Sequence, residues 1–512
     1  MKRLLWCLIA SLPSLAGAQD RPLRDQVRAF RERNETAIVR ELSEFLAIPN
    51  VATNPADIRR NAEHIQRMLW RRGVRSEILE VPDAPVSVYG ELMTPGATKT
   101  VVFYAHFDGQ PVDSAKWASP AFRPVLRSGP LGPGVREIAI PAENGFDPET
   151  RIFARSASDD KSPLVAMLWA LDALQAAGVA PSVNLKFFLE GEEEAGSANL
   201  RTVLTKYRGL LAADFWIFGD GPVHQTRTAQ AVFGVRGVVG ANLTVYGPSR
   251  PLHSGHYGNW APNPNAMMVH LLASMRDTEG RITIPGFYDD VDRLTADDRA
   301  AFRRIPPVER QLIAELQLGR TEGPPATLAE QLTLPALNLS GLAGGLAAGG
   351  EANLIGTTSN AYLDFRLVPR QTPARVRSLV EAHLRRQGFH LVTAEPDSAT
   401  LVNHPRVVRV TWSAGYPAAR TALSHPGAQA MLKAADRAAG TPLIRVPTLG
   451  GSLPLADFVD VLGIPFAILP IVNHDNNQHG ENENLRLKNL WDGIELYAGV
   501  LAWMGREWQA VP

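Results

Sequence analysis

In this 512-residue chain, an apolar run is followed immediately by polar residues that could bind metal ions. His106 and Asp108 come after the run at 100–105, and two residues apart on an extended segment they point to the same side. A ligating imidazole needs an acceptor for its second nitrogen, and a nearby carboxylate provides one. The spacing therefore predicts His106 as a metal ligand and Asp108 as the residue that orients it. A turn with a capping Asp is the plainer alternative.

Acidic residues follow other parts of the chain in a similar way. Asp159 and Asp160 stand before a predicted helix, where they could cap its N-terminus, or one carboxylate could bridge two metal ions. The acids at 190–194 follow a predicted buried strand and would repel one another unless a cation or shifted pKa values relieved them. One Glu as ligand and its neighbour as general base suits metal-assisted hydrolysis, but the spacing leaves open which does which.

Two further segments complete the candidate metal site. Asp220 follows the apolar run at 214–218, and His479 lies in a polar loop with no apolar face to pack against. The only cysteine, Cys7, lies in the N-terminal leader, so thiolate ligands and thiol nucleophiles are excluded from the mature chain. Nitrogen and oxygen ligands suit zinc, with manganese or cobalt as possible substitutes. Two ions sharing one carboxylate would leave room for a bridging water.

The elements that position these segments are predicted helices that alternate with apolar strands. This alternation predicts an α/β domain with a mainly parallel sheet. In such sheets, ligands bind beyond the carboxyl ends of the strands, which is where the polar segments fall. We expect strands over residues 75–81, 86–92, 100–105, 184–189, 214–218 and 465–472. We expect helices over residues 22–47, 57–72, 161–177, 426–439 and 487–508.

The character of the chain changes near residue 234. A Gly-containing, β-branched segment at 231–246 precedes predicted helices at 265–275 and 373–387, a polar helical stretch at 287–330 and an alternating strand at 361–367. This pattern predicts a separate α+β unit inserted in the first domain. We interpret the Gly-rich segment 341–350 as a loop.

The N-terminus predicts export. Lys2 and Arg3 precede an apolar run that ends at Leu15, and Ala16-Gly17-Ala18 offers the small residues of a cleavage site. We expect a signal peptide over 1–18 and a secreted or periplasmic protein without a membrane span after its removal. Lys and Arg total 52, as do Asp and Glu, so charge does not favour nucleic acid or an anionic membrane as a partner. The expected partner is a small molecule.

Taken in order, the motifs resemble those of the metallopeptidase family that contains carnosinases, aminoacylases, succinyl-diaminopimelate desuccinylase and glutamate carboxypeptidases. Residues 104–111, Tyr-Ala-His-Phe-Asp-Gly-Gln-Pro, match its His-x-Asp-x-Gln-Pro signature, and residues 155–163 and 190–197 resemble its Asp-Asp-Lys and Glu-Glu segments. The resemblance covers nearly the whole mature chain and is closest to the carnosinase-like dipeptidases. It implies an α/β/α zinc-peptidase catalytic domain over 19–235 and 416–512, with an inserted α+β lid and dimerisation domain over 236–415.

The resemblance also implies roles for the candidate residues around the metal. It implies two zinc ions per subunit, with Asp159 as the bridging ligand and a cis peptide bond after it. The implied ligands are His106, Asp159, Glu194, Asp220 and His479. Glu193 would be the general base, which takes a proton from the water between the metals and passes it to the leaving nitrogen. Asp108 would orient His106.

A second group of residues is implied to contact the substrate. His253 matches a family histidine that reaches the partner subunit's site in a homodimer, where it would stabilise the oxyanion. Arg366 resembles the family arginine that binds the substrate carboxylate. Asn353 and Ser452 are the other expected substrate contacts. Ser156 and Ser162 replace glycines of the family pattern, and we hypothesise that the extra acid Glu192 raises the pKa of Glu193.

Several functions are compatible with these residues and motifs. Hydrolysis of dipeptides or short peptides with a free C-terminal carboxylate leads, because the carnosinase-like motifs and the long insert favour it. Removal of an acyl group from an N-acyl amino acid uses the same fold, and Arg366 would serve either substrate. A single-metal hydrolase is a third possibility. An inactive binding protein would have lost a ligand or the base, and the sequence retains all of them.

Overall fold

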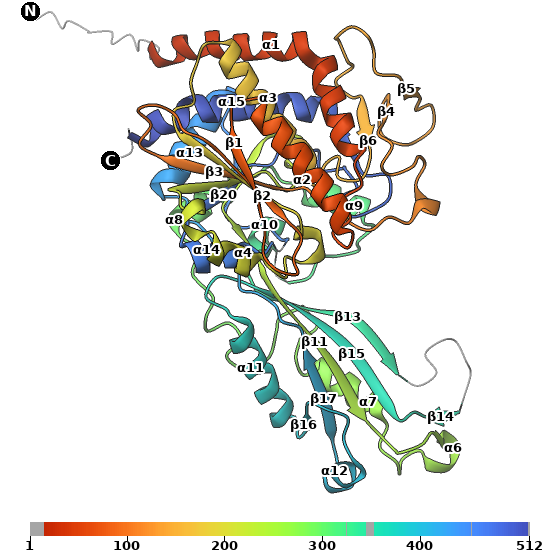
Figure 1. Cartoon of the computed structure of the whole chain (residues 1–512). Coiled ribbons are helices and arrows are strands. Elements are labelled where there is room, and N and C mark those ends of the chain that lie inside the picture. Colours follow the sequence, from red (N-terminus) through yellow and green to blue (C-terminus); the bar gives the residue numbers. More distant parts are fainter. Residues whose placement is uncertain (1–14, 324, 345–352, 452, 510–512) are drawn as a thin grey trace, which may run out of the picture. The chain divides into compact units, whose positions relative to one another are not determined.

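The computed structural model describes residues 15–323, 325–344, 353–451 and 453–509, which form two compact units (Figure 1). Unit 1 contains the described chain up to Ala231, Ser424–Ile444 and the chain from Ile464 onward. Unit 2 contains Val232–Leu423 and Arg445–Gly463. The predicted insert at 236–415 thus falls inside unit 2. The segment Arg445–Gly463, which we assigned to the catalytic domain, clusters with unit 2 instead.

An eight-stranded sheet, most of which belongs to unit 1, has the order β1-β2-β7-β3-β8-β20-β9-β19. Strand β3 pairs in parallel with both β7 and β8, and β8 pairs in parallel with β20, while β1 and β2 form an antiparallel margin. The strands are β1 (Arg75–Leu79), β2 (Ser87–Leu92), β3 (Thr100–His106), β7 (Asn184–Glu190), β8 (Phe215–Phe218), β9 (Gln230–Val232), β19 (Ile444–Val446) and β20 (Phe466–Ile468). The mainly parallel α/β fold predicted from the alternation of elements is confirmed.

Parallel pairing brings the carboxyl ends of three strands to one edge of this sheet. Residue His106 ends β3 opposite Glu190, the last residue of β7, and Tyr104 lies opposite Phe218, the last residue of β8. Buried apolar side chains fill β3 and β8, as expected for strands covered on both faces. The polar residues that follow each strand therefore emerge next to one another.

Helices flank the sheet of unit 1. They are α1 (Leu15–Leu46), α2 (Pro55–Trp70), α3 (Lys161–Ala176), α4 (Leu200–Lys206), α5 (Arg208–Leu211), α13 (Pro426–Ala439) and α15 (Leu487–Gln509). Helix α3 packs against α1 and α15, and α15 also packs against α13, whereas α2 packs against β1 and β2. Helix α2 begins two residues before the predicted start at 57, because Asn54 caps it and Pro55 occupies its first turn. Among the described helices, none is both long and apolar enough to cross a membrane.

A four-stranded sheet in unit 1 joins two distant parts of the chain. Its order is β21-β6-β4-β5, with β4 (Val125–Arg127), β5 (Glu137–Ile138), β6 (Arg151–Phe153) and β21 (Asn484–Arg486). Strand β6 pairs antiparallel with β21, so Phe153 lies opposite Asn484. The segment that leaves β6 toward Asp159 therefore runs beside the loop that carries His479 into β21.

Unit 2 is built on a five-stranded sheet in the order β13-β15-β11-β17-β16. These strands are β11 (Gly237–Tyr246), β13 (Ala336–Gly344), β15 (Thr358–Leu367), β16 (His390–Val392) and β17 (Val407–Trp412). One face packs on α7 (Pro264–Ala273) and α11 (Pro373–Arg386) through a core that includes Leu243, Leu271, Phe365 and Val380. Along β15 the side chains alternate, so Tyr362 is exposed on the other face.

Short elements complete unit 2. They are β10 (Gly234–Val235), β12 (Leu252–His253), β14 (Leu354–Ile355), β18 (Ala419–Arg420), α6 (Ser254–Tyr257), α8 (Ala296–Phe302), α9 (Glu309–Glu315), α10 (Leu328–Gln331), α12 (Ser398–Asn403) and α14 (Leu455–Leu462). The loop predicted over 341–350 is wrong at its start, because residues 341–344 belong to β13 and pair with β15 across a bulge. Pairing with a long neighbouring strand outweighs the low strand propensity of glycine there.

Candidate metal centre

The five predicted metal ligands converge on one site in unit 1. Two groups of side chains have ligand atoms that all lie within 4.8 Å of one another. The first group is His106, Asp159 and Asp220, and the second is Asp159, Glu194 and His479. His106 ends β3, Asp220 follows β8, and Glu194 follows β7, so three ligands come from the converging strand ends. The loops before α3 and β21 supply the other two.

Asp159 is shared between the two groups, with one oxygen directed to each. Its Oδ1 lies 2.8 Å from His106 Nε2, and its Oδ2 lies 3.1 Å from His479 Nε2. A carboxylate in this position can serve as a ligand of two cations at once. The Asp159–Asp160 peptide bond is cis, as the family resemblance implied.

Asp108 is placed to organise both the first ligand and the acidic loop. Its Oδ1 lies 3.3 Å from His106 Nδ1, within ion-pair distance but without good hydrogen-bond alignment. The same carboxylate accepts hydrogen bonds from the backbone N–H groups of Glu193 (3.1 Å) and Glu194 (2.9 Å). The second role was not foreseen, because spacing along one segment does not reveal a partner more than 80 residues away.

Buried negative charge defines the electrostatics of the site. Burial, with the charge of Asp159, raises the pKa of Glu194 to about 7 and that of Asp220 to about 6. Hydrogen bonding to Asp159 raises the pKa of His479 to about 9, although burial opposes this. Burial opposes ionisation of Asp159 as well, yet hydrogen bonds from both histidines hold its pKa below the usual value. Positive charge is thus needed among these carboxylates.

The predicted base, Glu193, lies beside these ligands. Burial raises its pKa well above the usual value; the charge of His106 opposes the rise, and Asp220 and Asp159 add to it. The extra acid Glu192 binds Asn199: its carboxylate accepts hydrogen bonds from the backbone N–H (3.1 Å) and the side-chain amide (2.8 Å) of that residue. The hypothesis that Glu192 raises the pKa of Glu193 is therefore not supported by the geometry.

Two polar residues near the site were not predicted as functional from the sequence. Gln110 donates a 2.8 Å hydrogen bond from Nε2 to Glu194 Oε2, which orients that carboxylate. Tyr104 donates a 2.8 Å hydrogen bond to Glu190 Oε2, and both side chains are buried. Gln110 stands inside the signature at 104–111, so its polar character in that motif was the available signal.

The predicted substrate contacts lie on unit 2. His253 precedes α6, and its ring accepts a hydrogen bond from the Gly255 N–H. Asn353 is its neighbour, because the Ser254 N–H donates to the Asn353 carbonyl (2.8 Å). Arg366 lies on β15, where its Nε donates to Asp364 Oδ2 (3.0 Å). Ser452 lies outside the described residues.

His253 and Arg366 lie toward opposite ends of unit 2. Strands β11 and β15 pair from Val238 opposite Arg366 to Tyr246 opposite Thr358. Beyond that second end lie α6 and β14 (Figure 1), and β12 pairs with β14. The paired stretch of β11 and β15 spans roughly 27 Å at about 3.4 Å per residue. One copy of unit 2 therefore does not bring both side chains to one small substrate.

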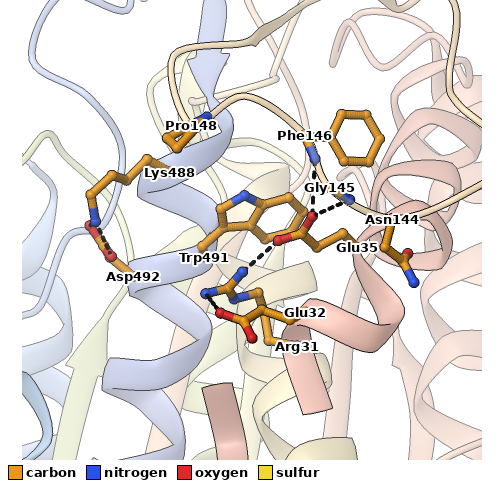
Figure 2. Close-up of a pocket in the computed structure, with 10 residues that line it drawn as sticks. All are labelled: Arg31, Glu32, Glu35, Asn144, Gly145, Phe146, Pro148, Lys488, Trp491 and Asp492. Atoms are coloured by element: carbon orange, nitrogen blue, oxygen red, sulfur yellow. Dashed lines mark hydrogen bonds and ion pairs between the residues drawn. The ribbon is translucent and has the colours of Figure 1, made fainter. Parts of the chain in front are cut away.

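A charged cavity of about 520 Å³ elsewhere in unit 1 is not a second candidate centre. It lies between α1, the loop around Gly145 and α15, and its charged groups pair among themselves (Figure 2). Glu35 binds Arg31 and accepts hydrogen bonds from the N–H groups of Gly145 (3.0 Å) and Phe146 (3.2 Å). Lys488 pairs with Asp492 (2.7 Å). These contacts join α1 to the loop.

The donor set fits two divalent cations. Each group offers a histidine nitrogen and carboxylate oxygens, the shared Asp159 has one oxygen for each, and buried Glu194 Oε1 has no hydrogen-bond partner. Nitrogen and oxygen donors of this kind suit zinc and related transition metals.

The chain is similar to known proteins over most of its length. The profile of Peptidase family M20/M25/M40 matches residues 102–503. Cys-Gly metallodipeptidase dug1 of Schizosaccharomyces pombe is 26% identical over 92% of this chain and 96% of its own length. Human Beta-Ala-His dipeptidase is 24% identical over 94% and 93%. The M20 family metallo-carboxypeptidase Sso-CP2 from Sulfolobus solfataricus superposes with a TM-score of 0.73 and 28% identity, covering 92% of this chain and 99% of that one.

Metal affinity should rise with pH. In the metal-free protein, burial opposes the charged form of His106, but Asp108 and Asp159 raise its pKa well above the usual value, and the pKa of His479 is raised to about 9. Both imidazoles are therefore protonated at neutral pH, and each must lose its proton to bind a metal. We expect the affinity for each ion to increase by at least about tenfold per pH unit between pH 6 and 8, with at least one proton released per ion. Titration against a competing chelator, and calorimetry in buffers of different ionisation enthalpy, measure both quantities. An affinity that is constant over this range would contradict the assignment of both histidines.

Proposed function

The chain belongs to peptidase family M20/M25/M40, and we propose that this metallopeptidase hydrolyses dipeptides with a free C-terminal carboxylate, using two zinc ions. The proposal rests on the position of Asp159, which belongs to both ligand groups and directs one carboxylate oxygen to each. The names of the relatives support the substrate class, since they act on Cys-Gly and on Beta-Ala-His. Manganese or cobalt could replace zinc in a nitrogen and oxygen donor set.

The side chains of this chain divide the chemical work. His106, Asp159 and Asp220 would hold one cation, and Asp159, Glu194 and His479 the other. When bound, the cations supply positive charge that polarises the scissile carbonyl and stabilises the transition state. The Glu193 carboxylate accepts a proton from the attacking water and delivers it to the leaving nitrogen. Asp108 fixes this acid by accepting hydrogen bonds from the Glu193 and Glu194 N–H groups.

Unit 2 would provide the substrate contacts. The Arg366 guanidinium would bind the substrate carboxylate through paired hydrogen bonds. The His253 imidazole would donate to the carbonyl oxygen as its negative charge develops. Because these residues lie toward opposite ends of the sheet of unit 2, we propose a homodimer in which His253 of one subunit serves the site of the other. Asn353, which bonds to the backbone beside His253, would act at the same shared site.

Export is a separate part of the proposal. The basic start, the apolar run and the small residues Ala16 and Ala18 support cleavage after Ala18 and a periplasmic or secreted enzyme. Cleavage there would remove the start of α1, which begins at Leu15. Sequencing the N-terminus of the protein recovered outside the cytoplasm should give a chain that begins at Gln19. An intact Met1 terminus would contradict cleavage.

Activity on a substrate panel tests the proposed reaction. We expect zinc-loaded protein to release amino acids from dipeptides such as Cys-Gly and β-Ala-His, and protein stripped by a chelator to be inactive until zinc is restored. N-acyl amino acids should be poor substrates, and dipeptides with an amidated C-terminus should show a raised KM because they lack the carboxylate. Metal-dependent cleavage of acyl amino acids alone would move the assignment to an acylase. Bound metal without cleavage of either class would favour a binding protein.

Replacement of the base tests the proton transfer. Glu193→Gln should keep its metal content and lose roughly 100-fold or more in kcat, because the amide cannot accept the proton. Glu192→Gln is the matched control, because Glu192 is adjacent to Glu193 but its carboxylate is hydrogen-bonded to Asn199. We expect its kcat to be nearly unchanged. Steady-state kinetics and metal analysis of both variants check this. Equal losses in the two variants would refute the assignment of Glu193.

Mixed dimers test the shared site. His253→Ala homodimers should lose most of their activity, as Glu193→Gln homodimers should. A dimer with one subunit of each kind contains one site with an intact base and an intact partner histidine, so co-expression should restore up to about half of the activity per dimer. Affinity tags on the two subunits isolate the mixed species for assay. A mixed dimer as inactive as its parents would exclude a shared site.

A further inference from the structure

A buried ion pair lies beside the candidate metal centre without belonging to either ligand group. Glu483 Oε2 lies 2.8 Å from Arg155 Nη1, and the two side chains are 0% and 2% exposed. Neither residue is among the side chains that could hold a metal. Burying two charges is costly unless their remaining hydrogen-bonding capacity is satisfied, so the other partners of this pair matter.

The Glu483 carboxylate accepts hydrogen bonds from the segment that carries the bridging ligand. Its Oε2 accepts from the Ser156 N–H (2.9 Å), and its Oε1 accepts from the N–H groups of Ser158 (2.9 Å) and Asp159 (3.0 Å). This segment precedes α3 and forms neither helix nor strand, so no regular backbone ladder fixes these groups. One carboxylate therefore sets the path of the backbone up to Asp159 itself.

The same ion pair also ties this segment to the loop that carries His479. Arg155 Nη2 donates to the Gly480 carbonyl (3.1 Å), directly after His479. The Ala154 N–H donates to the Glu483 carbonyl (3.2 Å), and the Asn484 N–H closes the loop on Asn476 (2.8 Å). The two ligand-bearing segments are more than 300 residues apart in the sequence, and the Arg155–Glu483 pair joins them.

We infer that Glu483 is a positioning residue for both metal sites, because it holds the backbone of Asp159 and the loop of His479 in the geometry that the ions require. The inference rests on the proposed metal centre, and metal binding tests it separately from peptidase activity. Loss of the carboxylate would leave buried N–H groups and a buried guanidinium without their acceptor. Asp159 would then adopt several positions, and since it belongs to both groups, both ions would be bound less tightly.

Glu483→Gln is the direct test, with Glu481→Gln as its matched control. The control makes the same chemical change in the same loop at an exposed position. We expect Glu483→Gln to weaken zinc binding by about 10–100-fold for both ions, as measured by competition with a chelator, and the control to bind like the parent. Because Glu483 is fully buried and belongs to neither ligand group, kcat at saturating zinc should return most of the way to the parent value.

Glu483→Asp distinguishes the effect of side-chain length from the effect of the negative charge. It keeps the negative charge but is one methylene shorter, so it cannot meet the three N–H groups and Arg155 together, and we expect zinc affinity to stay low. Parent-like zinc affinity in Glu483→Gln would overturn the inference, as would weakening of only one ion. If zinc binding falls while the parent shows no peptidase activity, the positioning role stands and the proposed function fails.

Hydrogen exchange of the parent protein keeps the inference testable even where a variant does not fold. We expect the amides of Ser158 and Asp159 to be protected already in the metal-free protein, because Glu483 accepts from both. Rapid exchange of these amides without metal, followed by protection only after zinc is added, would mean that the metal orders the segment. That result would also overturn the inference.

Discussion

Crowding of buried carboxylates at one edge of a parallel sheet is the constraint on which this site depends. Asp159, Glu194 and Asp220 belong to the two groups of closely spaced ligand atoms, Glu193 is the neighbour of Glu194, and burial raises the pKa of Glu193, Glu194 and Asp220. A protein interior does not stabilise such charges unless cations or protons compensate them. In the metal-free chain the protonated histidines and carboxyl groups compensate partly, and divalent cations would replace those protons.

The fold brings these groups together through strand order and through contacts between distant loops. Parallel pairing of β7, β3 and β8 aligns three strand ends, and the pairing of β6 with β21 sets the loops of Asp159 and His479 side by side. The Arg155–Glu483 pair then fixes these loops to one another. Arg366 and His253 are separated along the sheet of unit 2, so the substrate contacts proposed for them would require a second copy of the chain.

The sequence predicted what depends on local pattern. The strand at 100–105 and the pair His106 and Asp108 follow from apolar runs and two-residue spacing, and the structure has β3 end at His106. Spacing could not divide the roles of Glu193 and Glu194, and only the family resemblance assigned them. Sequence alone also missed Glu483, because its partners lie more than 300 residues away along the chain.

Long-range contacts also explain two predictions from local sequence pattern that the structure does not support. Residues 341–344 look like a loop from their glycine content, but the neighbouring strand β15 pairs with them. Glu192 looks like a charge that perturbs the base, but Asn199 binds it. In each case a partner that the local pattern does not specify decides the conformation.

Anomalous diffraction from zinc-loaded crystals would show whether Asp159 is shared by two metal ions. We expect two zinc peaks per chain, one coordinated by His106, Asp159 and Asp220 and the other by Asp159, Glu194 and His479. A single peak, or two peaks that do not share Asp159, would contradict this expectation.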